Sequence, residues 1–186
     1  MNELKQLFIS KFYDVLLLND NLEKKFTEIL VDITKSNYGY FNHVVTIDGK
    51  LYNKGSCLID RKNQLDKAEI DSFDGMLFPL AEEMKNKPWS QNWFKKKITC
   101  FDMSDRKERI CPIQNFEYYC NIPLMYNDEV VGCIALSGNS KYDKDTIDTL
   151  KEICKIISNQ LWKHKYSYDK IIKKKNYLYD FFLYVY

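Results

Sequence analysis

The sequence has few of the residues on which several common kinds of site depend. Among its 186 residues are only six glycines, and no glycine-rich loop has the spacing of a phosphate-binding motif. Its two histidines, His43 and His164, offer no arguable serine–histidine–acid triad. No two of its six cysteines form a CxxC pair, so we predict no structural zinc site and no other metal site.

The net charge of the sequence is small, and its apolar runs are short. The 28 basic and 26 acidic residues give a net charge of +2, which argues against a nucleic-acid-binding surface over the whole domain. No apolar run approaches the length of a membrane span, and Lys5, Lys11 and Asp14 interrupt the N-terminal stretch, so it does not have the pattern of a signal peptide. We therefore expect a cytoplasmic protein without nucleic-acid partners, whose cysteines are mostly small buried hydrophobic residues.

Helical spacing of apolar residues is clearest near the two ends of the chain. One apolar face over residues 3–18 predicts a first helix. Asp20 and Glu23 have the spacing of a capping box, so we expect a second amphipathic helix to begin there. Asp143 is placed to cap a long last helix, whose apolar stripe continues as far as Leu161.

The region after the second helix predicts a hairpin and then a less regular segment. Residues 39–47 and 51–59 are rich in aromatic and β-branched residues and flank Asp48-Gly49, a strong hairpin signal. Residues 61–71 are charged and lack a period, so we expect an exposed loop. Residues 73–86 could form a short helix, with Pro79 limiting where it begins.

A second pair of strands precedes the last helix. Residues 118–126 and 129–137 are nearly apolar throughout and are separated by Asn127-Asp128, so both strands should be covered on both faces of a sheet. Gly132 inside the second strand indicates a close backbone approach or a bulge. A further short strand is expected over residues 98–101.

The same region carries a recognisable residue pattern. Its members are Asn115-Phe116, Ile122-Pro123-Leu124, Glu129-Val130-Val131-Gly132, Ala135-Leu136, Tyr142-Asp143 and Leu150. Together with the order of the elements, this pattern resembles the GAF domain, most closely the GAF domains of sensory signalling proteins. The resemblance implies an α+β fold, an α/β/α sandwich with a central antiparallel sheet of about six strands flanked by N- and C-terminal helices. It divides the chain into an N-terminal helix (1–19), a GAF-like domain (20–162) and a basic and aromatic tail (163–186).

The resemblance also implies a function class. We expect a non-catalytic module that senses a small molecule or binds another protein, as a homodimer through its first and last helices. A ligand would lie between the sheet and the middle segment, lined by aromatic residues, although such residues could equally fill the core. The candidates are Phe78, Trp89, Trp93, Phe94, Phe116 and Tyr119. The motif of cyclic-nucleotide GAF domains is not recognisable, so that ligand is not supported and no cofactor is named.

The cysteines of the middle region leave two covalent alternatives. A bilin would need an exposed reactive thiol among Cys100, Cys111 and Cys120, and buried inert thiols are far commoner. The chain also resembles the free methionine-R-sulfoxide reductases, a GAF family with a thiolate nucleophile: Cys111 lies 12 residues before Pro123, and Cys100 could resolve it. The chain departs from that family because residues 136–140 contain no carboxylate to hold the substrate amine.

The tail combines two kinds of residue. Residues 163–175 carry six lysines, and residues 176–186 are almost all aromatic or aliphatic. We expect this end to pack on its own or a partner helix. Contact with an anionic membrane is not favoured, because the lysines precede the aromatic residues and do not form an opposite helical face.

Overall fold

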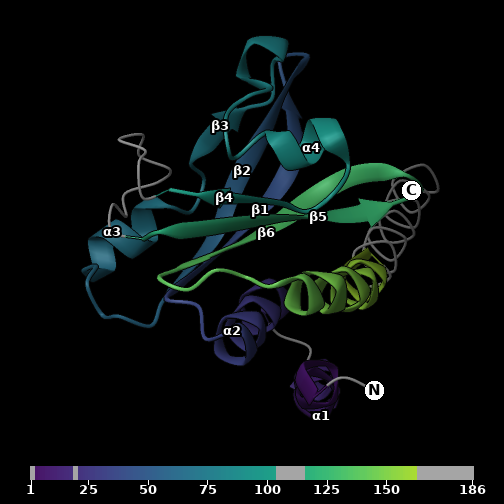
Figure 1. Cartoon of the computed structure of the whole chain (residues 1–186). Coiled ribbons are helices and arrows are strands. Elements are labelled where there is room, and N and C mark those ends of the chain that lie inside the picture. The colour runs from purple at the N-terminus through teal and green to yellow at the C-terminus, as the bar shows by residue number, and fades with distance from the viewer. Residues whose placement is uncertain (1–2, 19–20, 104–115, 163–186) are drawn as a thin grey trace, which may run out of the picture.

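The computed structural model describes residues 3–18, 21–103 and 116–162. Predictions that concern Asp20, Cys111 or the 163–186 tail lie outside this part of the chain. Within it, a six-stranded antiparallel sheet has the order β3-β2-β1-β6-β5-β4. The long helices lie on one side of the sheet and the short helices α3 and α4 on the other (Figure 1). The predicted α/β/α sandwich is therefore confirmed.

The elements follow one another in the predicted order of helices, hairpin, middle segment, hairpin and helix. The strands are β1 (Tyr38–Ile47), β2 (Lys50–Asp60), β3 (Leu77–Pro79), β4 (Thr99–Asp102), β5 (Tyr118–Tyr126) and β6 (Glu129–Gly138). The helices are α1 (Glu3–Leu18), α2 (Leu22–Thr34), α3 (Lys67–Ser72), the 3-10 helix η1 (Glu82–Met84), α4 (Gln91–Lys95) and the last helix, described over residues 144–162. No helix in the described ranges has both the length and the apolar character needed to span a membrane.

Both predicted hairpins are present, and both have two-residue turns with left-handed backbone. Asp48 and Gly49 have φ values of 49° and 73°, and Asn127 and Asp128 have values of 48° and 61°. Positive φ at both central residues is the type I′ arrangement, whose twist matches that of the flanking strands. The turn residues therefore fix the register of β1 with β2 and of β5 with β6.

Gly132 sits where β6 passes very close to β1. A Cβ atom at this position would lie 2.7 Å from the main-chain oxygen of Asn42. The register of β5 with β6 also shifts beside it, between Leu124 and Met125. The sequence expectation of a close approach at this glycine is confirmed, and only glycine fits there without a backbone shift.

The larger core lies between the sheet and the long helices. Strand residues on one face of the sheet, including Ile122 and Ile134, meet α2 and the last helix there. Leu150 and Ile157 of the last helix have no exposed surface, as their helical spacing predicts. The helix begins with the predicted cap, in which the Thr146 backbone N–H donates to Asp143 Oδ1 at 2.7 Å.

The middle segment differs from the sequence expectation in two places. The predicted loop at 61–71 contains α3, an exposed helix that begins with a capping box between Asp66 and Glu69. The helix expected within 73–86 is replaced by β3 and η1, because Pro79 is accommodated at the sheet edge, where a missing N–H costs little. Outside the middle segment, the predicted second helix is present as α2, which begins at Leu22 without a side-chain cap from Asn21, and Asp20 of the expected capping box lies outside the described residues.

Candidate functional site

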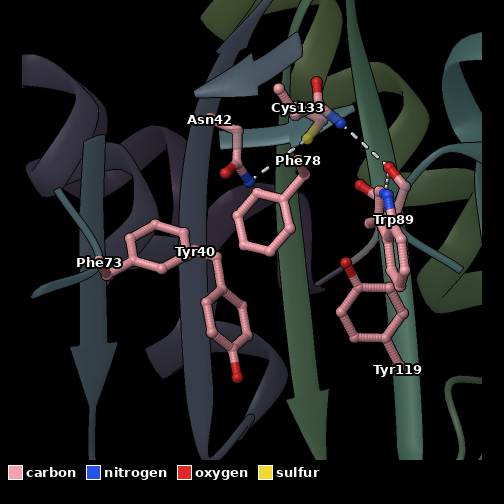
Figure 2. Close-up of a pocket in the computed structure, with 9 residues that line it drawn as sticks. Tyr40, Asn42, Phe73, Phe78, Trp89, Tyr119 and Cys133 are labelled. Carbon is pink, nitrogen blue, oxygen red and sulfur yellow. Dashed lines mark hydrogen bonds between the residues drawn. The ribbon is translucent and has the colours of Figure 1, made fainter. Parts of the chain in front are cut away.

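A small cavity lies on the face of the sheet away from the long helices. Strands β1, β2, β5 and β6 form its floor, and the segment from the end of α3 to the start of α4 covers it (Figure 2). The space open to the centre of a water-sized sphere is about 20 Å³, which is enough for a water molecule. The lining residues are Tyr40, Asn42, Asn53, Phe73, Phe78, Trp89, Tyr119, Asn121 and Cys133.

Period-two alternation along the strands places these side chains. In β5, Tyr119 and Asn121 face the cavity, whereas Cys120 and Ile122 between and beyond them face the long helices. In β6, Cys133 faces the cavity and Ile134 faces the helices. The same apolar strands therefore supply the core on one face and a polar cavity on the other.

Two asparagines attach the covering segment to the sheet. Asn53 Nδ2 donates to the main-chain oxygen of Trp89 at 3.0 Å, and Asn121 Nδ2 donates to the same oxygen at 3.2 Å. A carbonyl oxygen can only accept, so these contacts fix which end of each amide is the NH₂ group. The Oδ1 atom of Asn121 consequently points away from Trp89 and has no hydrogen-bond partner.

Within the described part of the chain, three buried polar atoms of the cavity residues lack a hydrogen-bond partner. They are Asn42 Oδ1, Asn121 Oδ1 and Trp89 Nε1, two acceptors and one donor. Leaving such a group buried and unpaired costs about 1–3 kcal/mol each, so native proteins rarely do so without a water or ligand to satisfy it. Among the residues that the structure describes, none that lines this cavity carries a formal charge at neutral pH. The site is thus suited to a neutral molecule with both donors and acceptors.

Cys133 contributes a thiol that stays protonated. Asn42 Nδ2 lies 3.5 Å from its Sγ atom. Burial raises the pKa of the Cys133 thiol to about 12, and the neighbouring amides of Asn42 and Asn92 only partly oppose that effect. At neutral pH this sulfur is therefore a neutral lining group and a poor nucleophile.

Aromatic rings form one continuous wall. Tyr40 packs on Phe73 with 5.6 Å between ring centroids, Phe73 packs on Phe78 at 6.2 Å, and Phe78 packs on Trp89 at 6.3 Å. Figure 2 shows these tilted rings in front of the strands of the sheet. Such rings offer a flat, apolar surface to a planar ligand.

The structure separates the six aromatic candidates into two sets of three. Phe78, Trp89 and Tyr119 line the cavity. Trp93 and Phe94 lie on α4 and contact each other edge-on at 4.8 Å, and Phe116 packs on Tyr119 at 6.0 Å without lining the cavity. Whether any of the six binds a ligand stays a prediction.

Sequence reasoning missed the polar members of the site. Asn42, Asn53 and Asn121 are each less than 10 % exposed, and Asn42 and Asn121 each interrupt a strand that is otherwise mostly apolar or aromatic. A buried asparagine in the middle of a strand was the available signal, because its amide must find a partner.

The candidate cysteines lie elsewhere. Cys100 on β4 stands directly opposite Cys120 on β5 in the sheet register, and both face away from the cavity. Cys111 is not among the residues that the structure describes. In the described ranges, no three His, Cys, Asp or Glu side chains gather as a metal ion would need.

Comparison with known proteins supports the fold. No protein-family model and no curated protein sequence matches this chain. The GAF domain of an Acinetobacter phosphoenolpyruvate-protein phosphotransferase is similar in structure, with a TM-score of 0.61, 9% identity and coverage of 86% of this chain and 93% of that one. The phycoerythrobilin-bound GAF domain of a cyanobacterial phytochrome is also similar, with a TM-score of 0.59 and 12% identity. That match covers 90% of this chain and 98% of the phytochrome domain.

An enzyme is also among the similar structures. The free methionine-R-sulfoxide reductase of Neisseria meningitidis, solved in complex with its substrate, has a TM-score of 0.65 and 11% identity. The match covers 90% of this chain and 95% of the reductase. Identities this low show the fold alone. The chain has a GAF-like fold, and its function has to be argued from its own residues.

Proposed function

We propose that this GAF-like domain is a non-catalytic sensory module that binds a small uncharged molecule in the cavity over β1, β5 and β6. The observation that carries the proposal is the set of three unpaired polar atoms, Asn42 Oδ1, Asn121 Oδ1 and Trp89 Nε1. A ligand that satisfied all three would recover the cost of burying them, which gives the site both affinity and selectivity.

The lining defines the class of ligand. The ligand would donate N–H or O–H groups to the two asparagine oxygens and accept a hydrogen bond from the indole N–H of Trp89. The aromatic wall favours a flat molecule, and the lack of charged lining residues disfavours a phosphate or carboxylate. A neutral heteroaromatic or cyclic amide with adjacent donors and acceptors fits these requirements.

Binding requires the covering segment to move. The present space of about 20 Å³ is far smaller than the usual ligand pocket of about 300 Å³ or more. The covering segment runs from the end of α3 through β3 and η1 to the start of α4, and all of these elements are only three to six residues long. It is attached to the sheet through the Trp89 carbonyl. Displacement of this segment would open the cavity and would provide the structural change that a sensor transmits.

Native mass spectrometry tests this proposal. The freshly purified chain should carry a non-covalent adduct that disappears on denaturation. Asn121→Leu, which removes one unpaired acceptor and fills the space, should lose the adduct. The same change at the exposed Asn159 of the last helix should keep it. An adduct retained in full by folded Asn121→Leu protein would place the ligand elsewhere.

A thiol-dependent reductase is the second candidate function. It rests on the similarity to the Neisseria enzyme and on the place of Cys111 in the sequence. Turnover of free methionine-R-sulfoxide by the wild-type chain, abolished by Cys111→Ser and retained by Cys57→Ser, would favour it. A chain without turnover in the presence of a thiol reductant would leave the binding module as the better description.

We also propose that the module is a homodimer through its first and last helices. Leu7 and Tyr13 on α1 are 44% and 65% exposed, although α1 already packs on α2 through Phe12 and Phe26. Light scattering of the wild-type chain and of Tyr13→Lys would test this. A wild-type monomer at micromolar concentration would contradict it.

A further inference from the structure

Two cysteines face each other across the edge of the sheet. Cys100 on β4 and Cys120 on β5 are direct register partners. Their sulfur atoms are 2.6 Å apart, well inside the usual distance of a thiol hydrogen bond. Neither sulfur lines the cavity, so this pair is separate from the proposed binding site.

The hydrogen-bond pattern of the two strands shows that this pair is of the non-hydrogen-bonded type, in which the two Cα atoms are closer together. Met103 N–H donates to the Glu117 carbonyl, and 103 and 117 continue the register of β4 with β5. Hydrogen-bonded and non-hydrogen-bonded pairs alternate along an antiparallel ladder, so Cys100 and Cys120 form a non-hydrogen-bonded pair. Such residues have Cα atoms about 4.5 Å apart, within the range of about 4.4–6.8 Å that a disulfide spans.

The two thiols differ in exposure and in acidity. Cys100 is exposed at the edge strand, whereas Cys120 is fully buried beneath the long helices. The hydrogen bond between the two sulfur atoms lowers the pKa of the Cys100 thiol. The neighbouring Cys100 sulfur and burial both raise the pKa of Cys120. One sulfur is therefore accessible and more readily ionised, and the other is held protonated beside it.

We propose that Cys100 and Cys120 are an oxidation site that reacts with hydroperoxides to form a cross-strand disulfide. The Cys100 thiolate attacks a peroxide oxygen, which gives a sulfenic acid and, for hydrogen peroxide, a hydroxide that takes up a proton as water. The Cys120 sulfur then attacks the sulfenic sulfur, loses its proton and releases a second water. Two thiols and one hydrogen peroxide thus become one disulfide and two waters.

The bond would fasten the edge strand β4 to the body of the sheet. Thr99, next to Cys100, pairs with Asn121 of the cavity. The disulfide would therefore lie one residue along β5 from a cavity residue, on the opposite face of the sheet. The closed loop of about 20 residues restricts the unfolded chain, so the oxidised protein should melt at a higher temperature than the reduced protein. Cys100 is exposed at the sheet edge, where a thiol reductant can reach the bond, and exposed disulfides are among the more readily reduced, which makes the site reversible.

Thiol counting and peptide mapping test the proposal on the full-length chain. The reduced protein is treated with hydrogen peroxide, its remaining thiols are alkylated, and its intact mass is measured. We expect the loss of two free thiols and of the mass of two hydrogen atoms. A tryptic peptide over residues 110–141 would carry three cysteines, so chymotrypsin, which cleaves after Phe116 and Tyr119, is added to separate Cys111 from Cys120.

Variants distinguish this pair from the other cysteines. Cys120→Ser should leave Cys100 as a sulfenic acid that reacts with dimedone, and Cys100→Ser should abolish the disulfide. Cys57→Ser, a partly buried control, should oxidise like the wild type. A wild-type peptide map that links Cys100 to Cys111, or that leaves Cys100 and Cys120 free, would overturn the proposal. This map needs no variant, so it holds even if Cys120→Ser folds poorly.

Discussion

Asn121 donates its side-chain amide to the main-chain oxygen of Trp89 at 3.2 Å, and this contact ties β5 to the segment that covers the sheet. Asn53 on β2 donates to the same oxygen from the other half of the sheet. One partly buried carbonyl thus receives two amides, and the two asparagines should be energetically coupled.

A double-mutant cycle measures this coupling. Asn53→Ala and Asn121→Ala should each lower the free energy of unfolding by about 1 kcal/mol, in addition to the cost of the cavity that the smaller side chain leaves. The loss of each single variant is limited because the other asparagine still donates to the Trp89 oxygen. The double variant leaves that partly buried oxygen without either amide donor, and its loss of stability should exceed the sum of the two single losses by about 1 kcal/mol. Urea unfolding gives the three values, and strictly additive losses would show that the two amides act independently.

Gly132→Ala should destabilise the protein by about 1–3 kcal/mol. The added Cβ would lie 2.7 Å from the Asn42 main-chain oxygen, which cannot rotate away as a flexible side chain would. Gly49→Ala is the matched control, since a Cβ there meets no atom within 4 Å and only the left-handed backbone is strained. Thermal unfolding of both variants makes the comparison, and a smaller loss for Gly132→Ala would contradict the close approach.

Leu150→Asp and Ile157→Asp test the packing of the last helix on the sheet. Both side chains are fully buried in the larger core, where an unpaired carboxylate has no partner. Each change should reduce the free energy of unfolding by about 3–5 kcal/mol or prevent folding. Asn159→Asp introduces the same charge on the exposed face and should change stability little. Equal thermal stability of all three variants would refute the assignment of the buried stripe.

Asp143 should make the free energy of unfolding depend on pH in the acidic range. The Thr146 backbone N–H donates to its carboxylate and lowers the pKa of that group below its ordinary value. A carboxylate whose pKa is lower in the folded state stabilises the protein when the pH is above its unfolded-state pKa of about 3.9. That contribution is lost as the pH falls through the folded-state pKa.

The variant Asp143→Ala isolates this effect. Urea midpoints of wild type and variant should differ most at about pH 6 and converge as the pH falls below about 4. A difference that stayed constant over this range would mean that the charge of Asp143 plays no part in the cap.

The sequence predicted those parts of the fold in which the local signal and the tertiary structure agree. Asp48-Gly49 and Asn127-Asp128 mark turns whose backbone only a few residue types tolerate, so both hairpins could be placed within a residue or two. Asp143 could be recognised as a cap because it precedes a long apolar period.

The elements that cover the cavity could not be predicted in the same way. Helices α3 and α4 and strand β3 are three to six residues long, too short to show a period, and their conformation depends on contacts with the sheet. For Asp66 and Glu69 the capping box was present in the sequence, but no apolar stripe followed it.

The site itself was predictable only in part. Aromatic residues of the middle segment were natural candidates, and three of the six line the cavity. Asn42 and Asn121 stand out in the sequence as asparagines within apolar strands, but assigning them to the cavity requires knowing which face of β1 and β5 the covering segment meets. The unpaired state of their oxygens is a property of the three-dimensional arrangement.

The indole N–H resonances of the tryptophans give the most direct test of the proposed binding site. Trp89 lines the cavity and its Nε1 has no partner, whereas Trp93 and Trp162 lie outside it. In a ¹H–¹⁵N spectrum, a neutral heteroaromatic ligand that raises the melting temperature should shift the Trp89 indole signal and leave the other two nearly unchanged. A stabilising ligand that leaves the Trp89 signal in place would contradict the assignment of the cavity as the binding site.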